Sequence, residues 1–381
     1  MTIELLHGVI LACLTAMGAV TLVNLVGFLS LRGCHPLHGR MISVLVPARN
    51  EERNIGRLLD LLALQDYPEY EVIVLDDQSD DRTPLIVRER MEAQPRVTLR
   101  TGRALPPGWV GKAHACDQLA RAAGGEVLLF MDADTQPSPQ ALSAGLSALE
   151  RTRADLLTVI PQQKVESFWE RVLLPVLHFS TFSFLPMPLV PITRSPRLAM
   201  ANGQYMMFRR DAYEGVGGHA AVRSALVEDV WLARRIKASG RKLVVRYGGD
   251  TVSCRMYGSL KEIWEGFSKN LFPGLDYSLA VLVSVVLLTV VTSILPFLLL
   301  GGALAGWIDT GIPLVEVGIV LAIRTGQALR FHMHLWSVVL HPLAMLIFLA
   351  IAVNSFVWTR QGEGVRWKGR AYKLRNPPVI L

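Results

Sequence analysis

Cysteine is scarce in this chain: its four residues are scattered and no CxxC pair occurs. This scarcity argues against a disulfide framework and against a cysteine zinc site. Charged residues are also few, at 19% of 381 residues, while 51% are hydrophobic. Such a balance excludes a disordered chain and is too apolar for an ordinary soluble domain. The net charge is +7, but no basic segment is interleaved with aromatics, so we expect no nucleic-acid partner.

Formal charge is absent from three long apolar runs near the ends of the chain, at 5–31, 277–308 and 331–359. Each run is long enough to cross a bilayer as a helix, which takes ~20 residues. The first run has no basic start and no obvious small-residue cleavage site, unlike a signal peptide. We therefore interpret residues 1–31 as an uncleaved N-terminal transmembrane anchor.

A second membrane region is predicted at 277–359. Its predicted parts are two spans and one re-entrant or interfacial segment, at about 277–304, 335–358 and 312–330. The last of these is interrupted by Glu316 and contains too short an apolar run for a crossing. The tail, residues 360–381, is strongly basic and is expected in the cytoplasm, which requires an even number of crossings after the middle of the chain. The same rule predicts a multi-pass protein of the plasma (inner) membrane with residues 32–276 in the cytoplasm.

The middle region, residues 32–276, alternates short apolar runs with helical patterns. Residues 42–47, 71–75 and 127–131 are predicted strands, and each precedes a helical pattern. This alternation predicts an α/β domain with a mostly parallel sheet. Ligands bind beyond the carboxyl ends of such strands. Acidic pairs follow all three strands: Glu51 and Glu52, Asp76 and Asp77, and Asp132 and Asp134.

The Asp132-Ala-Asp134 segment leaves a buried strand and enters a turn. Two carboxylates at this spacing can face one point, and hard oxygen ligands suit Mg²⁺ or Mn²⁺. A solvated acidic turn or a helix cap is the alternative interpretation. Alone, the spacing does not decide between them.

Four segments in a defined order carry a recognisable pattern: Pro47-Ala-Arg-Asn-Glu-Glu52, Asp76-Asp-Gln-Ser-Asp-Asp-Arg-Thr83, Asp132-Ala-Asp-Thr135 and Val227-Glu-Asp-Val230. This order resembles the family 2 glycosyltransferases with the GT-A fold, over residues 41–273. The region is also similar to the bacterial members that glycosylate carotenoids and to those associated with hopanoid genes. The segments behind this narrower resemblance are Gly108–Lys112, Asn202–Gln204, Phe208–Arg210, Gly217–His219, Gly266–Asn270 and Trp367–Arg370.

The resemblance implies a Rossmann-like GT-A domain, a nucleotide-sugar donor (UDP-hexose by family habit), Mg²⁺ or Mn²⁺, and inversion at the anomeric carbon. By motif position it implies a set of nucleotide-sugar-binding residues: Pro47, Ala48, Arg49, Glu51, Asp77, Lys112 and Asp132. Asp134, together with Asp132, would bind the metal. Asp229 would be the catalytic base, with Glu228 supporting it.

Chemistry gives each of these roles a reason. A departing nucleoside diphosphate accumulates negative charge, which a metal and a lysine such as Lys112 stabilise. An attacking hydroxyl must lose its proton to a carboxylate that stands apart from the metal, as Asp229 would. The alternatives are an ordinary exposed lysine and, for Glu228 and Asp229, simple complementation of the N-terminus of a helix at 227–239.

The acceptor side is predicted at Asn202, Gly203, Gln204 and His219. The alternatives are a turn at a strand edge for the first three and a structural role for His219. Lys269 and Asn270 are candidates for pyrophosphate contacts, although a lysine snorkelling at the membrane surface is equally compatible.

An aromatic segment with four prolines lies at about 169–193, and its residues 172–193 carry no formal charge. Its prolines argue against a straight transmembrane helix, and we expect it to lie in the membrane interface and to deliver a lipid acceptor. A buried core helix is the alternative. Nearby basic residues are candidates for lipid head-group contacts: Arg194, Arg197, Arg209 and Arg210.

The predicted function is transfer of one sugar to a membrane lipid, preferably an isoprenoid such as a carotenoid or hopanoid. The segment Gly266–Phe272 stands where processive relatives carry Gln-x-x-Arg-Trp, which favours a single transfer. A ceramide, diacylglycerol or polyprenyl-phosphate acceptor is the alternative. An inactive membrane scaffold is the alternative of another class. The oligomeric state stays open.

Overall fold

The computed structural model describes residues 3–32, 39–360, 365–367 and 370–372. The predicted basic tail lies largely outside these residues. The chain divides into two compact units. The helical unit comprises 1–28, 165–188 and 257–365, and the sheet unit comprises 29–164, 189–256 and 366–381.

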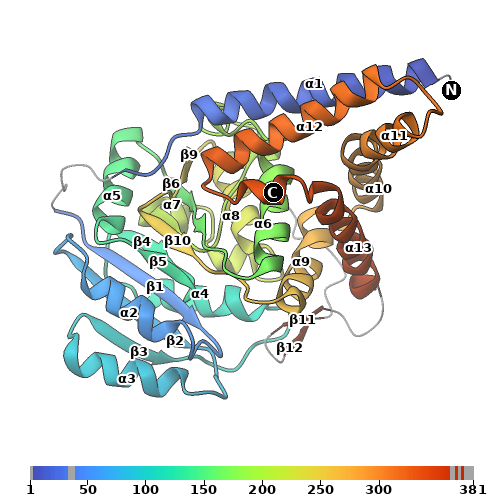
Figure 1. Cartoon of the computed structure of the whole chain (residues 1–381). Coiled ribbons are helices and arrows are strands. Elements are labelled where there is room, and N and C mark those ends of the chain that lie inside the picture. Colours follow the sequence, from blue (N-terminus) through green and yellow to red (C-terminus); the bar gives the residue numbers. More distant parts are fainter. Residues whose placement is uncertain (1–2, 33–38, 361–364, 368–369, 373–381) are drawn as a thin grey trace. The chain divides into compact units, whose positions relative to one another are not determined.

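The sheet unit is built on a seven-stranded sheet in the order β3-β2-β1-β4-β8-β6-β9 (Figure 1). Its strands are β1 (Ile42–Ala48), β2 (Tyr70–Asp76), β3 (Val97–Thr101), β4 (Val127–Phe130), β6 (Leu156–Ile160), β8 (Met206–Arg209) and β9 (Leu243–Tyr247). All pair in parallel except β8, which is antiparallel to both β4 and β6. The predicted α/β class with a mostly parallel sheet is confirmed.

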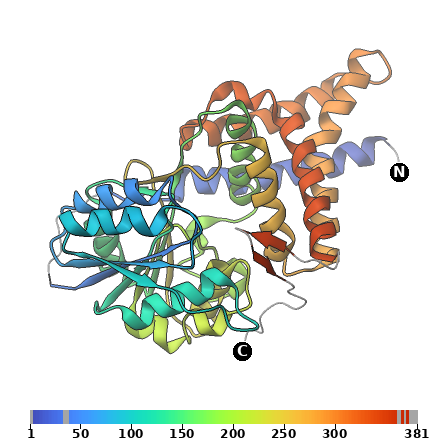
Figure 2. The same ribbon diagram turned by 90° about the horizontal axis from the view of Figure 1, so that it is seen from below.

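Helices connect and cover these strands. They are α2 (Ile55–Ala63), α3 (Thr83–Ala93), α4 (Gly111–Ala122), α5 (Ala141–Thr152), α7 (Arg210–Gly215) and α8 (Glu228–Ala238). The apolar stripe of α2 is fully buried in the core with the interior residues of β1, β2 and β4. Figure 2 shows α2 and α3 side by side. Because neighbouring parallel strands run in the same direction, their carboxyl ends lie at the same edge of the sheet.

Two smaller sheets complete the strands. The first has the order β5-β10-β7 and contains β5 (Thr135–Pro137), β7 (Gln162–Gln163) and β10 (Val252–Cys254). The second is the pair β11 (Val365–Trp367) and β12 (Arg370–Tyr372). Because β5 follows Asp134 directly, its pairing with β10 holds the acidic turn at a defined position.

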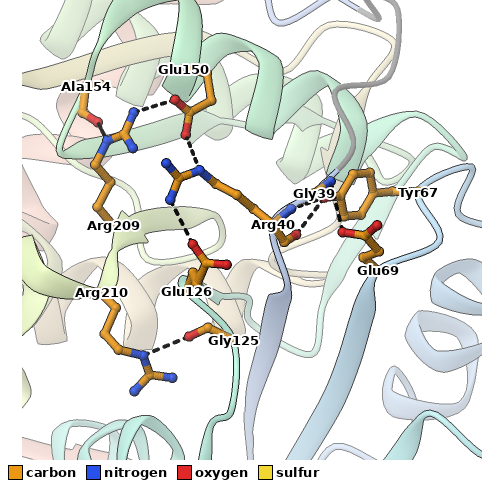
Figure 3. A network of polar contacts seen from close by, with 10 residues as sticks. All are labelled: Gly39, Arg40, Tyr67, Glu69, Gly125, Glu126, Glu150, Ala154, Arg209 and Arg210. Atoms are coloured by element: carbon orange, nitrogen blue, oxygen red, sulfur yellow. Dashed lines mark hydrogen bonds and ion pairs between the residues drawn. The ribbon is translucent and has the colours of Figure 1, made fainter.

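An ion-pair network lies around the amino-terminal end of β1, away from the carboxyl edge of the sheet (Figure 3). Arg40 contacts Glu126 at 3.0 Å and Glu150 at 3.1 Å, and Glu150 also binds Arg209 at 2.8 Å. Arg210 donates to the carbonyl of Gly125 at 2.7 Å. Arg209 and Arg210, predicted as candidates for lipid contacts, therefore use donors inside the sheet unit.

The helical unit contains α1 (Ile3–Gly27), α6 (Phe168–Phe182), α9 (Leu260–Gly274), α10 (Leu279–Thr289), α11 (Leu295–Leu304), α12 (Gly311–Arg330) and α13 (His341–Arg360). A π-helical turn at Val290–Ile294 joins α10 to α11. Among the described residues, four helical segments are long and apolar enough to cross a membrane: Ile3–Gly27, Leu279–Leu304, Gly311–Arg330 and His341–Arg360. The predicted N-terminal and C-terminal membrane helices are present.

The segment predicted as re-entrant or interfacial, 312–330, forms one continuous helix of 20 residues, α12, which is long and apolar enough to cross a membrane. Its re-entrant or interfacial position stays a prediction. The charges that shorten its apolar run face the inside of the helical unit. Glu316 is fully buried and lies 2.8 Å from His7 of α1. α1 and α12 run side by side (Figure 1). If all three candidate spans after residue 276 crossed the membrane, the tail would lie opposite residues 32–276, whereas the sequence predicted an even number of crossings there.

The segment at 169–193 begins as α6. A capping box starts this helix, because Ser167 and Glu170 bond each other's backbone amides. Pro175 lies inside the helix. Buried residues of α6 share an apolar core with α1, α12 and α13. The N-terminal part of the segment is therefore a helix packed within the helical unit, and not a core helix of the sheet unit as in the alternative interpretation. Its predicted interfacial position stays a prediction.

Candidate functional site

The acidic groups that follow β1, β2 and β4 converge at the carboxyl edge of the sheet. The loops after β1 and β2 turn sharply, since Asn50 (φ 52°) and Gln78 (φ 58°) both adopt left-handed backbone conformations. Arg49 holds the two loops together by donating to the carbonyls of Asp77 at 2.6 Å and Gln78 at 2.5 Å.

The remaining donor-side residues lie on the same two strands and loops. Pro47 and Ala48 end β1 and pair with Leu75 and Asp76 of β2. Asp77 is buried, and its amide donates to the carbonyl of Ala48 at 2.7 Å. These contacts form one rigid corner at the sheet edge.

Lys112 joins the two acidic motifs that are most distant in the sequence. It stands in the first turn of α4, and its Nζ lies 2.8 Å from both carboxylate oxygens of Asp132. The same Nζ lies 3.0 Å from Glu228 Oε1 on α8. The neighbouring carboxylates outweigh desolvation and hold the pKa of Lys112 well above its usual value. This lysine is therefore a fixed cation between the two motifs.

Asp229 lies beside this bridge in the first turn of α8. Its Oδ2 accepts from the amide of Gly203 at 2.9 Å, and its Oδ1 accepts from its own helix at Val230. Burial, followed by the charge of Glu228, raises the pKa of Asp229 to about 6. A carboxyl with this pKa can hold a proton near neutral pH.

Asp134 is held by Gln204, whose Nε2 donates to Oδ2 at 3.1 Å. Its other oxygen, Oδ1, is buried and has no hydrogen-bond partner among the described residues. Burial, with the charges of Asp132 and Glu51, raises the pKa of Asp134 to about 7. An unpartnered carboxylate oxygen beside further carboxylates fits a hard divalent cation. Within the described ranges, however, no group of three or more His, Cys, Asp or Glu residues forms a complete metal cluster.

His219 is close enough to feel the charge of Lys112, but its side chain packs in the core. Its Nδ1 and the Tyr213 hydroxyl lie 2.8 Å apart, and its ring contacts that of Phe130. Burial, with the charge of Lys112, lowers the pKa of His219 to about 3. These contacts are those of a packing residue, and its acceptor-side role stays a prediction.

Lys269 and Asn270 belong to α9 of the helical unit. Their predicted pyrophosphate contacts therefore concern the other unit and stay a prediction. Asn202, by contrast, lies in the sheet unit, where its side chain accepts from the amide of Gln204 at 2.9 Å. This bond shapes the turn that presents Gly203 to Asp229.

Comparison with known proteins identifies a domain. Glycosyl transferase family 2 matches residues 43–217, a range that includes β1, β2, the Asp132-Ala-Asp134 turn and Gly203. Residues 43–217 form a family 2 glycosyltransferase domain.

Two curated relatives of this glycosyltransferase extend the match beyond the domain. The 4,4'-diaponeurosporenoate glycosyltransferase of Staphylococcus haemolyticus (strain JCSC1435) is 27% identical over 347 residues, covering 88% of this chain and 89% of that protein. The protein of the same name from Staphylococcus aureus (strain MRSA252) is 26% identical over 351 residues, with the same coverage of both chains.

A solved structure shows the same fold. The mannosyltransferase PcManGT from Pyrobaculum calidifontis, in complex with GDP-Man and Mn²⁺, has a TM-score of 0.56 and 20% identity. The match covers 93% of this chain and 100% of that one. The glycosyltransferase domain is thus GT-A-like in architecture.

One contact in the glycosyltransferase site was missed by sequence reasoning. Cys254 of β10 is fully buried, and its Sγ lies 3.3 Å from Gln204 Oε1 and 3.0 Å from Gln163 Nε2. It thereby fixes the amide that holds Asp134. A single cysteine far along the chain carries no sequence signal for this position.

Gly203 leaves room for Lys112 in the glycosyltransferase site. A Cβ at this position would lie 2.7 Å from Lys112 Nζ and 3.6 Å from Asp229 Oδ2. We expect Gly203→Ala to displace the flexible lysine end and lower kcat about tenfold, as for a misplaced catalytic group. The melting temperature should barely change. Gly124→Ala is the control, since its Cβ would meet Glu71 at an ordinary 3.4 Å; equal rates for both variants would contradict this expectation.

Loss of the Lys112 charge should shift the pH profile of the glycosyltransferase. The lysine charge lowers the pKa of Asp229, so in Lys112→Gln we expect this pKa to rise above about 6. Less of the Asp229 carboxyl is then ionised at a given pH, and we expect the acidic limb of kcat to move to higher pH. Steady-state rates across pH test this, with Lys242→Gln as the control because the Lys242 ammonium donates to the Thr152 carbonyl at 2.7 Å. An unmoved limb would refute the coupling.

Proposed function

We propose that this glycosyltransferase moves one sugar from a nucleotide-sugar, preferably a UDP-hexose, to a membrane lipid with inversion of the anomeric carbon. The observation that carries the proposal is the Lys112 bridge, which joins Asp132 of the donor-side motif to Glu228 beside the proposed base. In this proposal, a single site would hold both a group for the leaving diphosphate and a group for the acceptor proton.

The donor end of the proposed site uses the corner between β1 and β2. Pro47, Ala48, Arg49, Glu51 and Asp77 are proposed to line the nucleoside. Arg49 donates hydrogen bonds to the loop carbonyls of Asp77 and Gln78, so it would act by holding this corner in shape. Support comes from the family match, whose range contains all five residues.

Asp134 and Asp132 are the residues proposed to hold Mg²⁺ or Mn²⁺. The buried, unpartnered Oδ1 of Asp134 supports this assignment. When bound, such an ion would offset the negative charge that develops on the departing diphosphate. Lys112 supplies a second positive charge from this chain, placed 2.8 Å from Asp132.

Asp229 is the proposed general base. An acceptor hydroxyl would attack the anomeric carbon, its proton would pass to an Asp229 oxygen, and the sugar–phosphate bond would break with its electron pair going to the diphosphate. Glu228 is proposed to support this step by holding Lys112, whose charge offsets part of the rise in the pKa of Asp229. The Gly203 amide orients the base.

The proposed acceptor is an isoprenoid lipid. Two observations support it: the curated relatives are named for 4,4'-diaponeurosporenoate, and four apolar helices can each cross a membrane. We propose that Asn202, Gly203 and Gln204 flank the acceptor side and that the chain resides in the plasma (inner) membrane. The sheet unit would then face the cytoplasm, as the basic residues after the first helix predict.

Lipid extraction from cells with and without the gene tests the function. Mass spectrometry should find a lipid that is heavier by one hexose only when the intact gene is present, and the lipid without the added mass identifies the acceptor. Complementation with the Gly124→Ala chain should restore the product. If no glycolipid differs between the two strains, the isoprenoid assignment is wrong.

A further inference from the structure

Arg324 is a fully buried cation in the interior of the helical unit. Its side chain is 0% exposed, although it lies on α12, one of the helices able to cross a membrane. It donates one hydrogen bond, from Nη1 to the carbonyl of Pro175 at 3.1 Å. Nε and Nη2 have no hydrogen-bond partner among the described residues. A guanidinium stays charged in proteins, so two of its donor groups are buried without compensation.

The other buried polar side chains of α12 have partners on neighbouring helices. Glu316 contacts His7 at 2.8 Å. Gln327 donates to Ser183 at 3.1 Å and to Thr21 at 3.4 Å. Within the described part of the chain, no carboxylate pairs with Arg324. Burial of an unpaired charge is costly, and ionisable residues within membrane helices mark functional sites by default.

Two imidazoles stand close to this guanidinium. Phe179 of α6 has Arg324 over its ring at 5.8 Å and the ring of His341 edge-on at 4.6 Å. His341 is 0% exposed, and neither of its nitrogens has a partner among the described residues. His178 faces the Leu174 carbonyl of its own helix without a hydrogen bond of normal geometry. The charge of Arg324 acts on both imidazoles.

The depth and walls of this cluster suit the head of a lipid. His341 is the first residue of α13, and Arg324 lies within two turns of the end of α12. Both are therefore near helix ends, where head groups lie. Aromatic rings lie beside these polar groups: Phe179 contacts both Arg324 and His341, and His178 lies 4.9 Å from Phe331, which stacks on Phe182 at 4.5 Å. Such apolar neighbours fit an apolar chain behind a charged head.

We propose that Arg324, His341 and His178 form a site for the acidic head group of a lipid. The anion would accept hydrogen bonds from Arg324 Nε and Nη2 and from an N–H of His341. These donors, which have no partner among the described residues, would then each have one. Its source is either an acidic acceptor lipid or an anionic phospholipid of the bilayer. All three residues belong to the helical unit, whereas Asp229 belongs to the sheet unit.

Equilibrium binding of a fluorescent polyene acid tests the site. The full chain in neutral-lipid nanodiscs is titrated with cis-parinaric acid and with its methyl ester, which differ only in the charged head. We expect the acid to bind about tenfold more tightly than the ester, as for hydrogen bonds to a charged group. Arg324→Gln should abolish this preference while leaving ester binding unchanged, and Arg324→Lys should retain part of it. Arg330→Gln, on the same helix, is the matched control.

Further measurements distinguish the two sources of the anionic head group, and they do not depend on catalysis. Stronger displacement of the probe by phosphatidylglycerol than by neutral lipid indicates a phospholipid source; retention of the probe indicates an acidic acceptor. Asp229→Asn should bind the acid like the natural chain, although it should transfer little sugar. A natural chain that transfers no sugar but keeps the acid preference counts against the proposed function alone. Equal binding of acid and ester, preference retained in Arg324→Gln, or displacement by free acetate would overturn the lipid site. Ester binding reports folding in every variant.

Discussion

Replacing Asp229 with asparagine is expected to lower kcat about 10²–10⁴-fold, the range for loss of a general base. Asparagine has the same shape as aspartate. Its side-chain oxygen can still accept the hydrogen bond that the Gly203 backbone amide donates to Asp229, at 2.9 Å, in the natural chain, so the site should remain intact. Asparagine cannot take the acceptor proton. Nucleotide release with a saturating acceptor and donor measures the loss.

Two comparisons make this result specific to the base. Asp60→Asn is the matched control, because Asp60 pairs with Arg90 at 2.6 Å on exposed surface between α2 and α3. The natural chain should lose rate as pH falls through about 6, where Asp229 is protonated, and the asparagine variant should lack this limb. Full rate in Asp229→Asn would contradict the base role and indicate an acceptor that is already ionised, such as a phosphate or carboxylate.

Replacing Asp134 with asparagine is expected to remove most of the metal-dependent rate. A bound cation supplies several kcal/mol of charge stabilisation, so its loss corresponds to about a thousandfold in kcat. Rates measured after chelation and during titration with Mg²⁺ or Mn²⁺ test this expectation. The natural chain should respond to the metal, Asp60→Asn should respond equally, and Asp134→Asn should need far more metal or not respond.

Thermal unfolding separates this loss from misfolding. The pKa of Asp134 is about 7 when folded against an ordinary 3.8, so its contribution is fully present below the ordinary value and is lost as pH rises through about 7. In chelator at neutral pH, Asp134→Asn should therefore unfold no lower than the natural chain and should lose this part of the pH dependence. If the natural chain keeps full activity after chelation, the metal assignment is wrong.

Much of the sheet unit was predictable because its signals are local. Short apolar runs became β1, β2 and β4, and the stripe of Ile55, Leu58, Leu59 and Leu62 became the buried face of α2. The long apolar helices were predictable for the same reason, except that Glu316 made the apolar run within α12 look too short for a crossing. A hydropathy pattern contains no information on the pairing of Glu316 with His7, which lies over three hundred residues away in the chain.

The sequence by itself determined the family, the α/β class and the apolar helices, because motif order, strand composition and uncharged runs are properties of neighbouring residues. Only the tertiary structure decided that Lys112 bridges Asp132 and Glu228, that Cys254 steadies Gln204 beside Asp134, and that Arg324 is buried without a carboxylate partner. Each of these depends on the distance between side chains from separate elements. Such distances arise when strands and helices pack, and no local pattern encodes them.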